Sequence, residues 1–98
     1  HEVALTVVYA AKGYPAKPET GTEIKAIDAA SRHDGVMIFH AGTKRDAEGR
    51  LLANGGRVLA VTGMGPKLQN AKDRAYGAVR AIDWPGGIYR SDIGWRAL

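Results

Sequence analysis

The first apolar segment of the chain, residues 3–10, carries hydrophobic side chains on both faces of an extended backbone. Alternation puts Val3, Leu5, Val7 and Tyr9 on one face and Ala4, Thr6, Val8 and Ala10 on the other. Such a pattern is typical of a strand in the middle of a sheet. We therefore expect a central strand buried on both sides. A loop should follow over residues 12–21, where Pro15 and Pro18 lack backbone donors.

The next segment predicts a short helix that is capped by Thr20 or Thr22 and ends near Ser31. Glu23 in its first turn suits the positive end of the helix dipole. The apolar positions of this helix are Ile24, Ile27 and Ala30.

A strand is expected over residues 36–40, which are rich in β-branched and aromatic side chains and follow the turn Asp34-Gly35. The charged residues 44–50 indicate an exposed turn, and Leu51-Leu52 resumes a short strand. This stretch therefore predicts a hairpin.

Asn54-Gly55-Gly56-Arg57 separates two apolar runs and starts a long strand that continues through residues 58–62. Asn-Gly between apolar runs is a strong signal for a tight hairpin turn. The same residues suit an anion, because glycines let a ligand approach the backbone and Arg57 adds a planar cationic group. Both interpretations stay open, since a turn that starts a strand can also hold a phosphate or carboxylate.

The clearest helical pattern lies in the last third of the chain. Pro66 suits the first helical position, and apolar side chains then recur at helical spacing. These side chains are Leu68, Ala71, Ala75, Val79 and Ile82. Residues 84–87, Trp-Pro-Gly-Gly, end the helix, and residues 88–90 predict a brief strand. Many strands, two helices and short turns together predict an α+β domain built on an antiparallel β-sheet.

Composition limits the chain to a single globular domain, residues 1–98, with 45% hydrophobic and 24% charged residues. The net charge of +4 is spread without a basic run, so we expect no nucleic-acid partner. No segment approaches the ~20 apolar residues of a membrane span, so no membrane association is expected. The chain lacks cysteine, which is compatible with a reducing compartment, and we expect a cytoplasmic location.

Glycine adjoins a polar or cationic group at four places near strand ends. They are Lys12-Gly13-Tyr14, His40-Ala41-Gly42-Thr43, Asn54-Gly55-Gly56-Arg57 and Asp92-Ile93-Gly94. Loops of this kind that converge at one sheet edge form a polar rim for an anionic ligand, although turn chemistry also explains each one separately. We see no nucleophile elbow, no phosphate-binding loop and no pair of residues at metal-ligand spacing. The sequence therefore predicts no catalytic residue and no metal site.

For His40 and Trp84, a structural role has to be weighed against a functional one. His40 is the histidine that ends an apolar strand beside a glycine turn, but a lone histidine there is more often structural. Trp84 follows Ile82 at the helix end and is expected to pack there rather than to stack on nucleic-acid bases.

In this order, these stretches resemble a known family: the C-terminal domain of phosphoribosylamine-glycine ligase, or glycinamide ribonucleotide synthetase, of the ATP-grasp superfamily. The resemblance covers nearly the whole chain. The matching segments are Leu5-Thr6-Val7-Val8, Gly13-Tyr14-Pro15, Gly21, Phe39-His40-Ala41-Gly42-Thr43, Asn54-Gly55-Gly56-Arg57-Val58-Leu59 with Val61-Thr62, Ala71, Arg74-Ala75-Tyr76 with Ala78-Val79, and Tyr89-Arg90-Ser91-Asp92-Ile93-Gly94. The two longer motifs are specific as a pair.

The resemblance implies a ligase that joins glycine to 5-phosphoribosylamine in de novo purine synthesis and converts ATP to ADP and phosphate with magnesium. It implies that missing upstream domains hold ATP, magnesium and glycine. The present chain would pack on those ATP-grasp domains as the C-terminal, substrate-side domain, with a barrel-like sandwich as an alternative to an open sheet. Alone, it is expected to be inactive.

The resemblance also implies a substrate site. Arg57 would anchor the phosphate of phosphoribosylamine, beside Asn54 and the amides of Gly55 and Gly56. Its neighbouring wall would be His40, Gly42 and Thr43, with the loop Gly13-Tyr14-Pro15 near the cleft.

Three residues depart from the usual family pattern. Lys12 and Ala16 stand where many relatives carry glycine, and Trp95 stands where histidine is common. The contacts of the first loop and of the tail therefore stay open. The alternative function, from another class, is a free-standing binding or protein-interaction module without catalytic activity.

Overall fold

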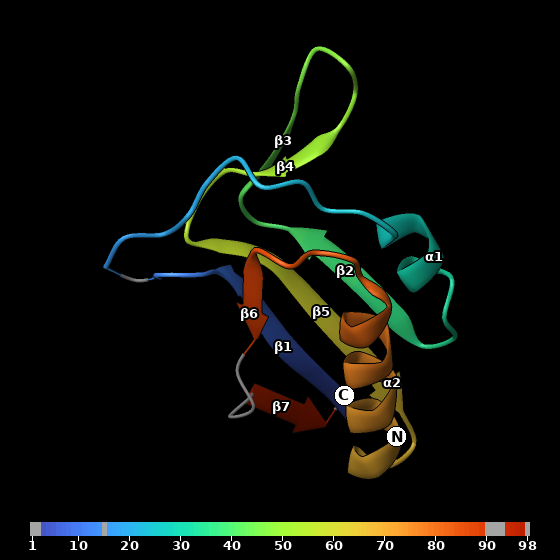
Figure 1. Cartoon of the computed structure of the whole chain (residues 1–98). Helices are drawn as coiled ribbons and strands as arrows, with labels where there is room; N and C mark the ends of the chain where they lie inside the picture. The colour runs from blue at the N-terminus through green and yellow to red at the C-terminus, as the bar shows by residue number, and fades with distance from the viewer. Residues whose placement is uncertain (1–2, 15, 90–93, 98) are drawn as a thin grey trace.

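The computed structural model describes residues 3–14, 16–89 and 94–97, which form a main antiparallel sheet, a small second sheet and two helices (Figure 1). In chain order the elements are β1 (Val3–Ala11), α1 (Ile27–Ser31), β2 (Val36–His40), β3 (Thr43–Arg45), β4 (Leu51–Ala53), β5 (Arg57–Gly65), α2 (Leu68–Ala81), β6 (Gly87–Tyr89) and β7 (Gly94–Ala97). The main sheet has the order β2-β5-β1-β6, with β7 also paired to β1. The predicted α+β fold is confirmed, and the sheet is not closed into a barrel.

β1 is the central strand, as its pattern predicts. It pairs with β5 from Val3 opposite Gly65 to Ala10 opposite Arg57, and β6 and β7 share its other edge. Its two faces differ in burial. The buried side chains are Leu5, Val7 and Tyr9, and the partly buried ones are Ala4, Thr6 and Val8. The prediction of burial on both sides is therefore wrong for this part of the strand.

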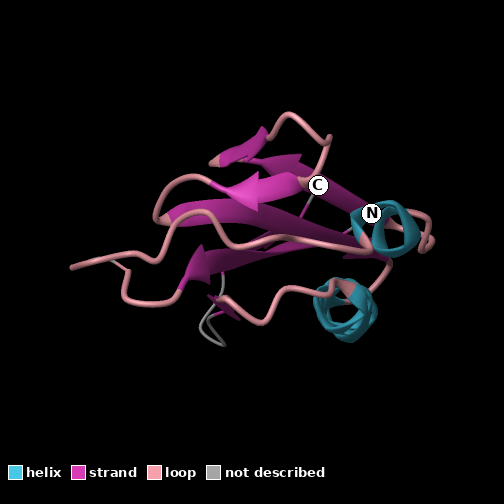
Figure 2. Cartoon of the chain, turned by 45° about the horizontal axis from the view of Figure 1, so that its top comes forward, coloured by secondary structure: helices cyan, strands magenta, loops and turns pink. Residues whose placement is uncertain are grey.

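Both helices pack on the face of the sheet that carries the buried side chains, and Figure 2 shows them next to each other. α2 matches the predicted helix but begins at Leu68, so Pro66 lies just outside it. It approaches β5 closely at Gly63, where a side chain would lie 2.2 Å from the carbonyl oxygen of Ala71. Packing at the end of α2 is confirmed for Trp84, whose side chain is buried. No helix in the described ranges is long and apolar enough to span a bilayer.

The first helix is shorter than predicted: α1 begins at Ile27 rather than at a threonine cap, and it ends at Ser31 as expected. The residues before it bond to distant backbone instead. The N–H of Ile24 donates to the carbonyl of Leu51 at 2.8 Å. Ala26 then adopts a left-handed backbone with φ of 65°, which a helix does not continue through. These long-range bonds outweigh the local helical preference.

The turn at Asn54 to Arg57 is not a hairpin, so that interpretation is wrong. β4 before the turn pairs with β3, whereas β5 after it pairs with β1 and β2, so the turn connects two different sheets. A type I′ hairpin turn requires positive φ at both central residues, and neither Gly55 nor Gly56 has one. The other predicted hairpin is confirmed by β3 and β4, which project from the main sheet (Figure 1).

Candidate functional site

Three of the four glycine loops meet at one end of the main sheet. At the end of β1, the N–H of Ala11 donates to the carbonyl of Gly56 at 2.8 Å. The N–H of Asn54 donates to the carbonyl of Gly42 at 2.7 Å. These bonds tie the loops after β1, β2 and β4 together. Of the fourth loop, Asp92 and Ile93 lie outside the described residues, as does Pro15 of the first.

Gly94, the one described residue of the fourth loop, does not join this cluster. It pairs with Thr6 in the middle of β1 rather than with the end of that strand. The loop after β2 is instead fixed to β5, because the carbonyl of Val58 accepts hydrogen bonds from Ala41 at 2.9 Å and Gly42 at 3.1 Å. The cluster is therefore held by backbone bonds that leave side chains available for other contacts.

At two positions of the cluster, Gly42 and Gly56, neighbouring atoms lie too close to leave room for a side chain. A side chain on Gly42 would lie 2.7 Å from the carbonyl oxygen of Arg57. On Gly56 it would lie 2.1 Å from the ring of Tyr14, so this ring rests against the Gly56 backbone. Gly55 differs, because its nearest neighbours would be 3.7 Å from such an atom, an ordinary contact distance.

Gly13 shapes the first loop rather than the rim itself. Its φ is 88°, and a side chain there would lie 2.1 Å from the carbonyl oxygen of Lys17. Gly13 lies inside a tight turn that is closed by a hydrogen bond from the N–H of Tyr14 to the carbonyl of Ala11, at 3.1 Å. This turn brings the Tyr14 ring back over the cluster.

Arg57 is an exposed cation of the cluster, as is Lys12 of the first loop. Arg57 lines an open depression of about 480 Å³ together with Tyr14 and Gly56 from the cluster and with apolar residues of the sheet. The apolar lining consists of Val8, Ala41, Leu59 and Ala60. Among the described residues, no carboxylate or carbonyl engages the Arg57 guanidinium, which has five N–H donors. The N–H groups of Gly55 and Gly56 also donate to no described backbone carbonyl.

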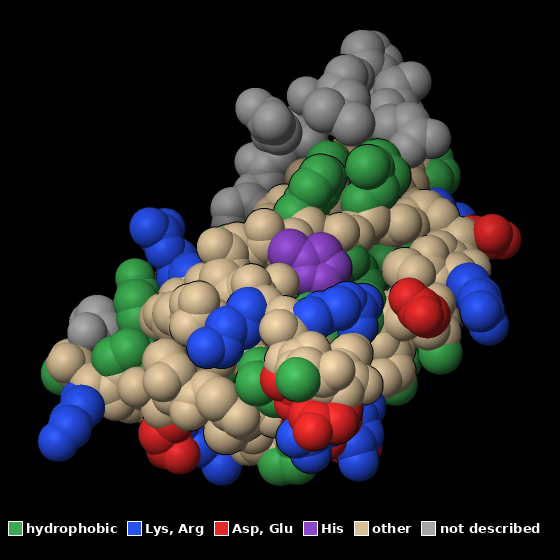
Figure 3. Space-filling model, turned by 90° about the horizontal axis from the view of Figure 1, so that it is seen from above, with side chains coloured by type: hydrophobic (Ala, Val, Ile, Leu, Met, Phe, Trp, Pro, Cys, Tyr) green, Lys and Arg blue, Asp and Glu red, His purple; other side chains and the backbone are tan. Residues whose placement is uncertain are grey.

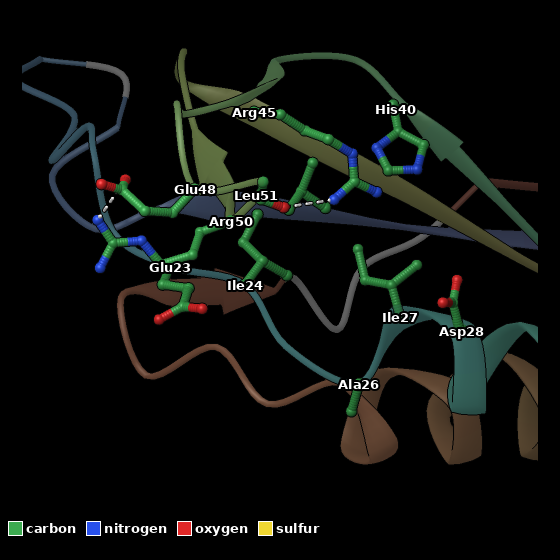
Figure 4. Close-up of a pocket in the computed structure, with 11 residues that line it drawn as sticks. Glu23, Ile24, Ala26, Ile27, Asp28, His40, Arg45, Glu48, Arg50 and Leu51 are labelled. Atoms are coloured by element: carbon green, nitrogen blue, oxygen red, sulfur yellow. Dashed lines mark hydrogen bonds and ion pairs between the residues drawn. The ribbon is translucent and has the colours of Figure 1, made fainter.

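His40 lies in a different depression, of about 360 Å³, between the β3–β4 hairpin and the start of α1. Its Nδ1 lies 3.0 Å from Oγ1 of Thr43. Figure 4 shows the Arg45 guanidinium beside the His40 ring, and this guanidinium donates to the carbonyl of Gly49 at 2.8 Å. The structure therefore does not bring His40 and Arg57 into one described depression, although the sequence placed them in the same rim.

The β3–β4 hairpin is fixed by Asp46. Its carboxylate accepts hydrogen bonds from the N–H of Glu48 at 3.0 Å and from the N–H and Nε of Arg50 at 2.8 and 2.7 Å. Desolvation raises the pKa of the Asp46 carboxyl, but the bonds from Arg50 and Glu48 outweigh it and hold this pKa below its usual value. The charged side chains at the tip of the hairpin are therefore paired with one another.

Charges of both signs are interspersed around this end of the molecule. Seen from above, Lys and Arg side chains lie near acidic ones and near a histidine, without a broad patch of one sign (Figure 3). Within residues 3–14, 16–89 and 94–97, no three His, Cys, Asp or Glu side chains are grouped so that they could hold a metal ion.

Sequence reasoning missed two contacts of these depressions. It treated Arg45 as part of an exposed turn, whereas β3 carries its side chain back to His40. It also gave no contact between Tyr14 and Gly56, which are 42 positions apart. The only signal for that contact was the pair of glycines, whose small size permits the approach.

Comparison with known proteins gives consistent matches over nearly the whole chain. Residues 4–96 match the family model described as phosphoribosylglycinamide synthetase, C domain. A phosphoribosylamine–glycine ligase of Caulobacter vibrioides is 55% identical over 97 residues, which cover 99% of this chain and 22% of that protein. The chloroplastic phosphoribosylamine–glycine ligase of Arabidopsis thaliana is 54% identical over 96 residues, which cover 97% of this chain and 18% of that protein.

A solved structure agrees with these matches. The crystal structure of phosphoribosylamine–glycine ligase from Thermotoga maritima superposes with a TM-score of 0.77 and 38% sequence identity. The match covers 91% of this chain and 21% of that one. The chain therefore spans about a fifth of the length of the relatives it matches.

Proposed function

This chain belongs to the phosphoribosylglycinamide synthetase C-domain family, and we propose that it is the substrate-side C domain of a full-length phosphoribosylamine–glycine ligase. Proteins more than 50% identical to it carry that name. The full enzyme would join glycine to 5-phosphoribosylamine while ATP is converted to ADP and phosphate. The present chain would line the phosphoribosylamine side of the cleft and be inactive alone.

The observation that supports this role is the Arg57 guanidinium, which has no partner among the described residues and lies beside the unbonded N–H groups of Gly55 and Gly56. A phosphate monoester fits such a group, because two of its oxygens can accept parallel hydrogen bonds from the guanidinium. The N–H groups of Gly55 and Gly56 can donate to the same ligand, and the Tyr14 ring forms a wall of the depression. We therefore assign the phosphate of phosphoribosylamine to Arg57.

His40 has a more distant place in this proposal. With Arg45 it lines the neighbouring depression, on the other side of the loop that contains Gly42, and its Nδ1 lies 3.0 Å from Oγ1 of Thr43. We keep Gly42 in the site because its backbone supports the turn that carries Arg57. His40 and Thr43 would contact a substrate only if it extends past this loop.

ATP and magnesium belong to the rest of the enzyme in this proposal. The described residues include no His, Cys, Asp or Glu cluster that fits a metal ion, and the magnesium ligands would lie in the remaining domains. Glycine would likewise bind to the remaining four-fifths of the ligase, against which the C domain packs. We propose the cytoplasm as the compartment, with which the absence of cysteine is compatible.

The test replaces Arg57 with alanine in a chimera, in which this chain substitutes for the corresponding fifth of the Caulobacter ligase. Loss of a charge-assisted phosphate contact of roughly 1.5–3 kcal/mol predicts an increase of about 10- to 100-fold in KM for phosphoribosylamine. KM for ATP should be unchanged. Arg80→Ala, which removes another exposed arginine on α2, is the matched control. If Arg57→Ala leaves both KM and kcat for phosphoribosylamine at the level of this control, Arg57 is not the anchor.

The isolated chain offers a second test against the alternative of a free-standing interaction module. Ribose 5-phosphate should shift NMR signals of Arg57 and its neighbours, and a short oligonucleotide should not. The reverse result would support the interaction module instead.

A further inference from the structure

Among residues 3–14, 16–89 and 94–97, no helix covers the face of the main sheet that lies opposite α1 and α2. Side chains of three adjacent strands share this face, because Thr6 of β1 pairs with Thr62 of β5 and Met37 of β2 pairs with the same Thr62. The Oγ1 atoms of Thr6 and Thr62 lie 2.9 Å apart, which places these side chains on one side. We call this surface the open face. It consists of Ala4, Thr6, Val8, Met37, Phe39, Ala60, Thr62 and Met64.

The open face exposes large apolar side chains. Met37 is 47% exposed and Phe39 is 50% exposed, and both lie on β2, the edge strand of the main sheet. None of the eight residues of the open face is charged, whereas charged side chains cover the hairpin and the outer side of α2. Three strands about 4.8 Å apart, with up to about five residues along each, give the face an area on the order of 250 Å². Exposed apolar patches of a few hundred Å² on soluble proteins are often functional.

The open face is continuous with the Arg57 depression. Val8 and Ala60 belong to both, and Ala60 is paired with Phe39. A partner that covers the face would therefore stand directly beside the Arg57 guanidinium. Relatives of this chain are about five times longer, so their own sequence contains a partner of sufficient size.

We propose that the open face, centred on Met37 and Phe39, is the surface on which the rest of the full-length ligase packs. This inference rests on the proposed function, because that function requires the remainder of the enzyme to close the cleft next to Arg57. The contacting surface of the remainder should be apolar and uncharged, since charged residues are depleted in the centre of such interfaces. The charged β3–β4 hairpin should stay outside the interface core.

Hydroxyl-radical footprinting with mass spectrometry tests this surface. The isolated chain and the Caulobacter chimera are labelled under identical conditions, and modification of Met37 and Phe39 is compared between them. Labelling of both residues should fall about fivefold or more in the chimera, because side chains at the centre of an interface lose almost all contact with solvent. Leu68, which is 42% exposed at the start of α2, should be labelled equally in both proteins and is the internal control.

Equal labelling of Met37 and Phe39 in the two proteins would overturn the proposal. So would protection that is already present in the isolated chain and disappears on dilution, because the face would then bind a second copy of the chain. A Phe39→Ser chimera gives an independent readout. It should regain Met37 labelling and become sensitive to proteolysis between the domain and the remainder, whereas Leu68→Ser should not.

The footprint separates this inference from the assignment of Arg57. Protection of Met37 requires no bound substrate, whereas the Arg57→Ala measurement depends on phosphoribosylamine alone. Protection with an unaltered KM in Arg57→Ala would retain the packing surface and reject the phosphate anchor. A raised KM without protection would do the reverse.

Discussion

At the scale of single residues, glycines with and without a close neighbour should respond to alanine in opposite ways. Gly63→Ala places a methyl group 2.2 Å from the carbonyl oxygen of Ala71, so α2 has to move away from β5. We expect a loss of about 1–3 kcal/mol in the free energy of unfolding. Gly77→Ala, within α2, meets nothing within 4 Å and should gain about 0.5–1 kcal/mol from helix propensity. Urea denaturation measures both, and effects of the same sign would contradict the packing of α2.

The pair Gly55 and Gly56 gives a matched test within the site. Gly56→Ala forces the partly exposed ring of Tyr14 off the backbone, whereas Gly55→Ala creates only ordinary contacts. In the chimera, Gly56→Ala should raise KM for phosphoribosylamine at least about threefold, because a displaced wall leaves the phosphate less precisely oriented beside Arg57. Gly55→Ala should leave KM nearly unchanged. A larger effect from Gly55→Ala would show that glycine is needed at position 55 rather than at position 56.

Residue chemistry explains why part of the site followed from the sequence. Arg57 was placed correctly at the start of a strand, because strand alternation separates it from the buried Val58. Its proximity to Tyr14 depends on the contact of the Tyr14 ring with the Gly56 backbone across 42 positions, for which the small size of glycine is the only sequence signal. His40 and Arg57 line different depressions because their side chains project to different sides of the loop between them. Local sequence patterns do not contain that information.

At the scale of elements, the β3–β4 hairpin should depend on pH through Asp46. The pKa of this carboxyl in the folded chain lies below its unfolded value of about 3.9, because Arg50 and Glu48 donate to the ionised form. The stabilisation is therefore complete above that unfolded value, and it is lost as the pH falls through the lower folded pKa. NMR shifts of the Glu48 and Arg50 amides report the titration. A midpoint at or above about 4 would contradict the sign of the shift.

An Asp46→Asn variant supplies the control for this titration. It keeps the shape of the side chain but removes its charge, so the acid-dependent change at the Glu48 and Arg50 amides should disappear. The amides of α2, far from the hairpin, should be unaffected in either protein.

Helices and strands differed in how well their sequence patterns predicted them. α2 was predicted almost completely, because its apolar side chains repeat over fourteen residues and bury one face. α1 was predicted too long, because Ile24 and its neighbours form backbone bonds with β4 and with the segment after α2. A short helical pattern carries too little energy to resist such pairing.

At the scale of the whole molecule, the α+β class followed from the alternation of apolar residues, but the one-sided packing did not. The pattern of β1 is apolar on both faces, and in the present chain only one face is covered by helices. The apolar pattern on both faces of β1 and the cover on only one of them are consistent if the second face is covered by a part of the enzyme outside this chain. The departure from the predicted burial is therefore an argument for the open face as an interface.

For the molecule as a whole, the contacts of Trp84 join segments from the two ends of the chain. Nε1 of Trp84 donates to Oγ1 of Thr22 at 2.8 Å, and its ring lies 4.8 Å from that of Tyr9, so one side chain links the segment before α1 to β1. Trp84→Ala should cost about 3–5 kcal/mol, a large share of the roughly 5–15 kcal/mol typical of a domain. Trp84→Phe keeps the packing but removes the donor, and should cost about 1 kcal/mol.

Urea denaturation followed by circular dichroism measures both Trp84 variants. Because the Tyr9 contact is apolar and the Thr22 contact is a hydrogen bond, the difference between Ala and Phe separates the two contributions. Thr22→Val, which removes the acceptor with similar volume, should match Trp84→Phe, and the double variant should lose little more than either alone. Fully additive losses would show that Trp84 and Thr22 are not coupled through this hydrogen bond.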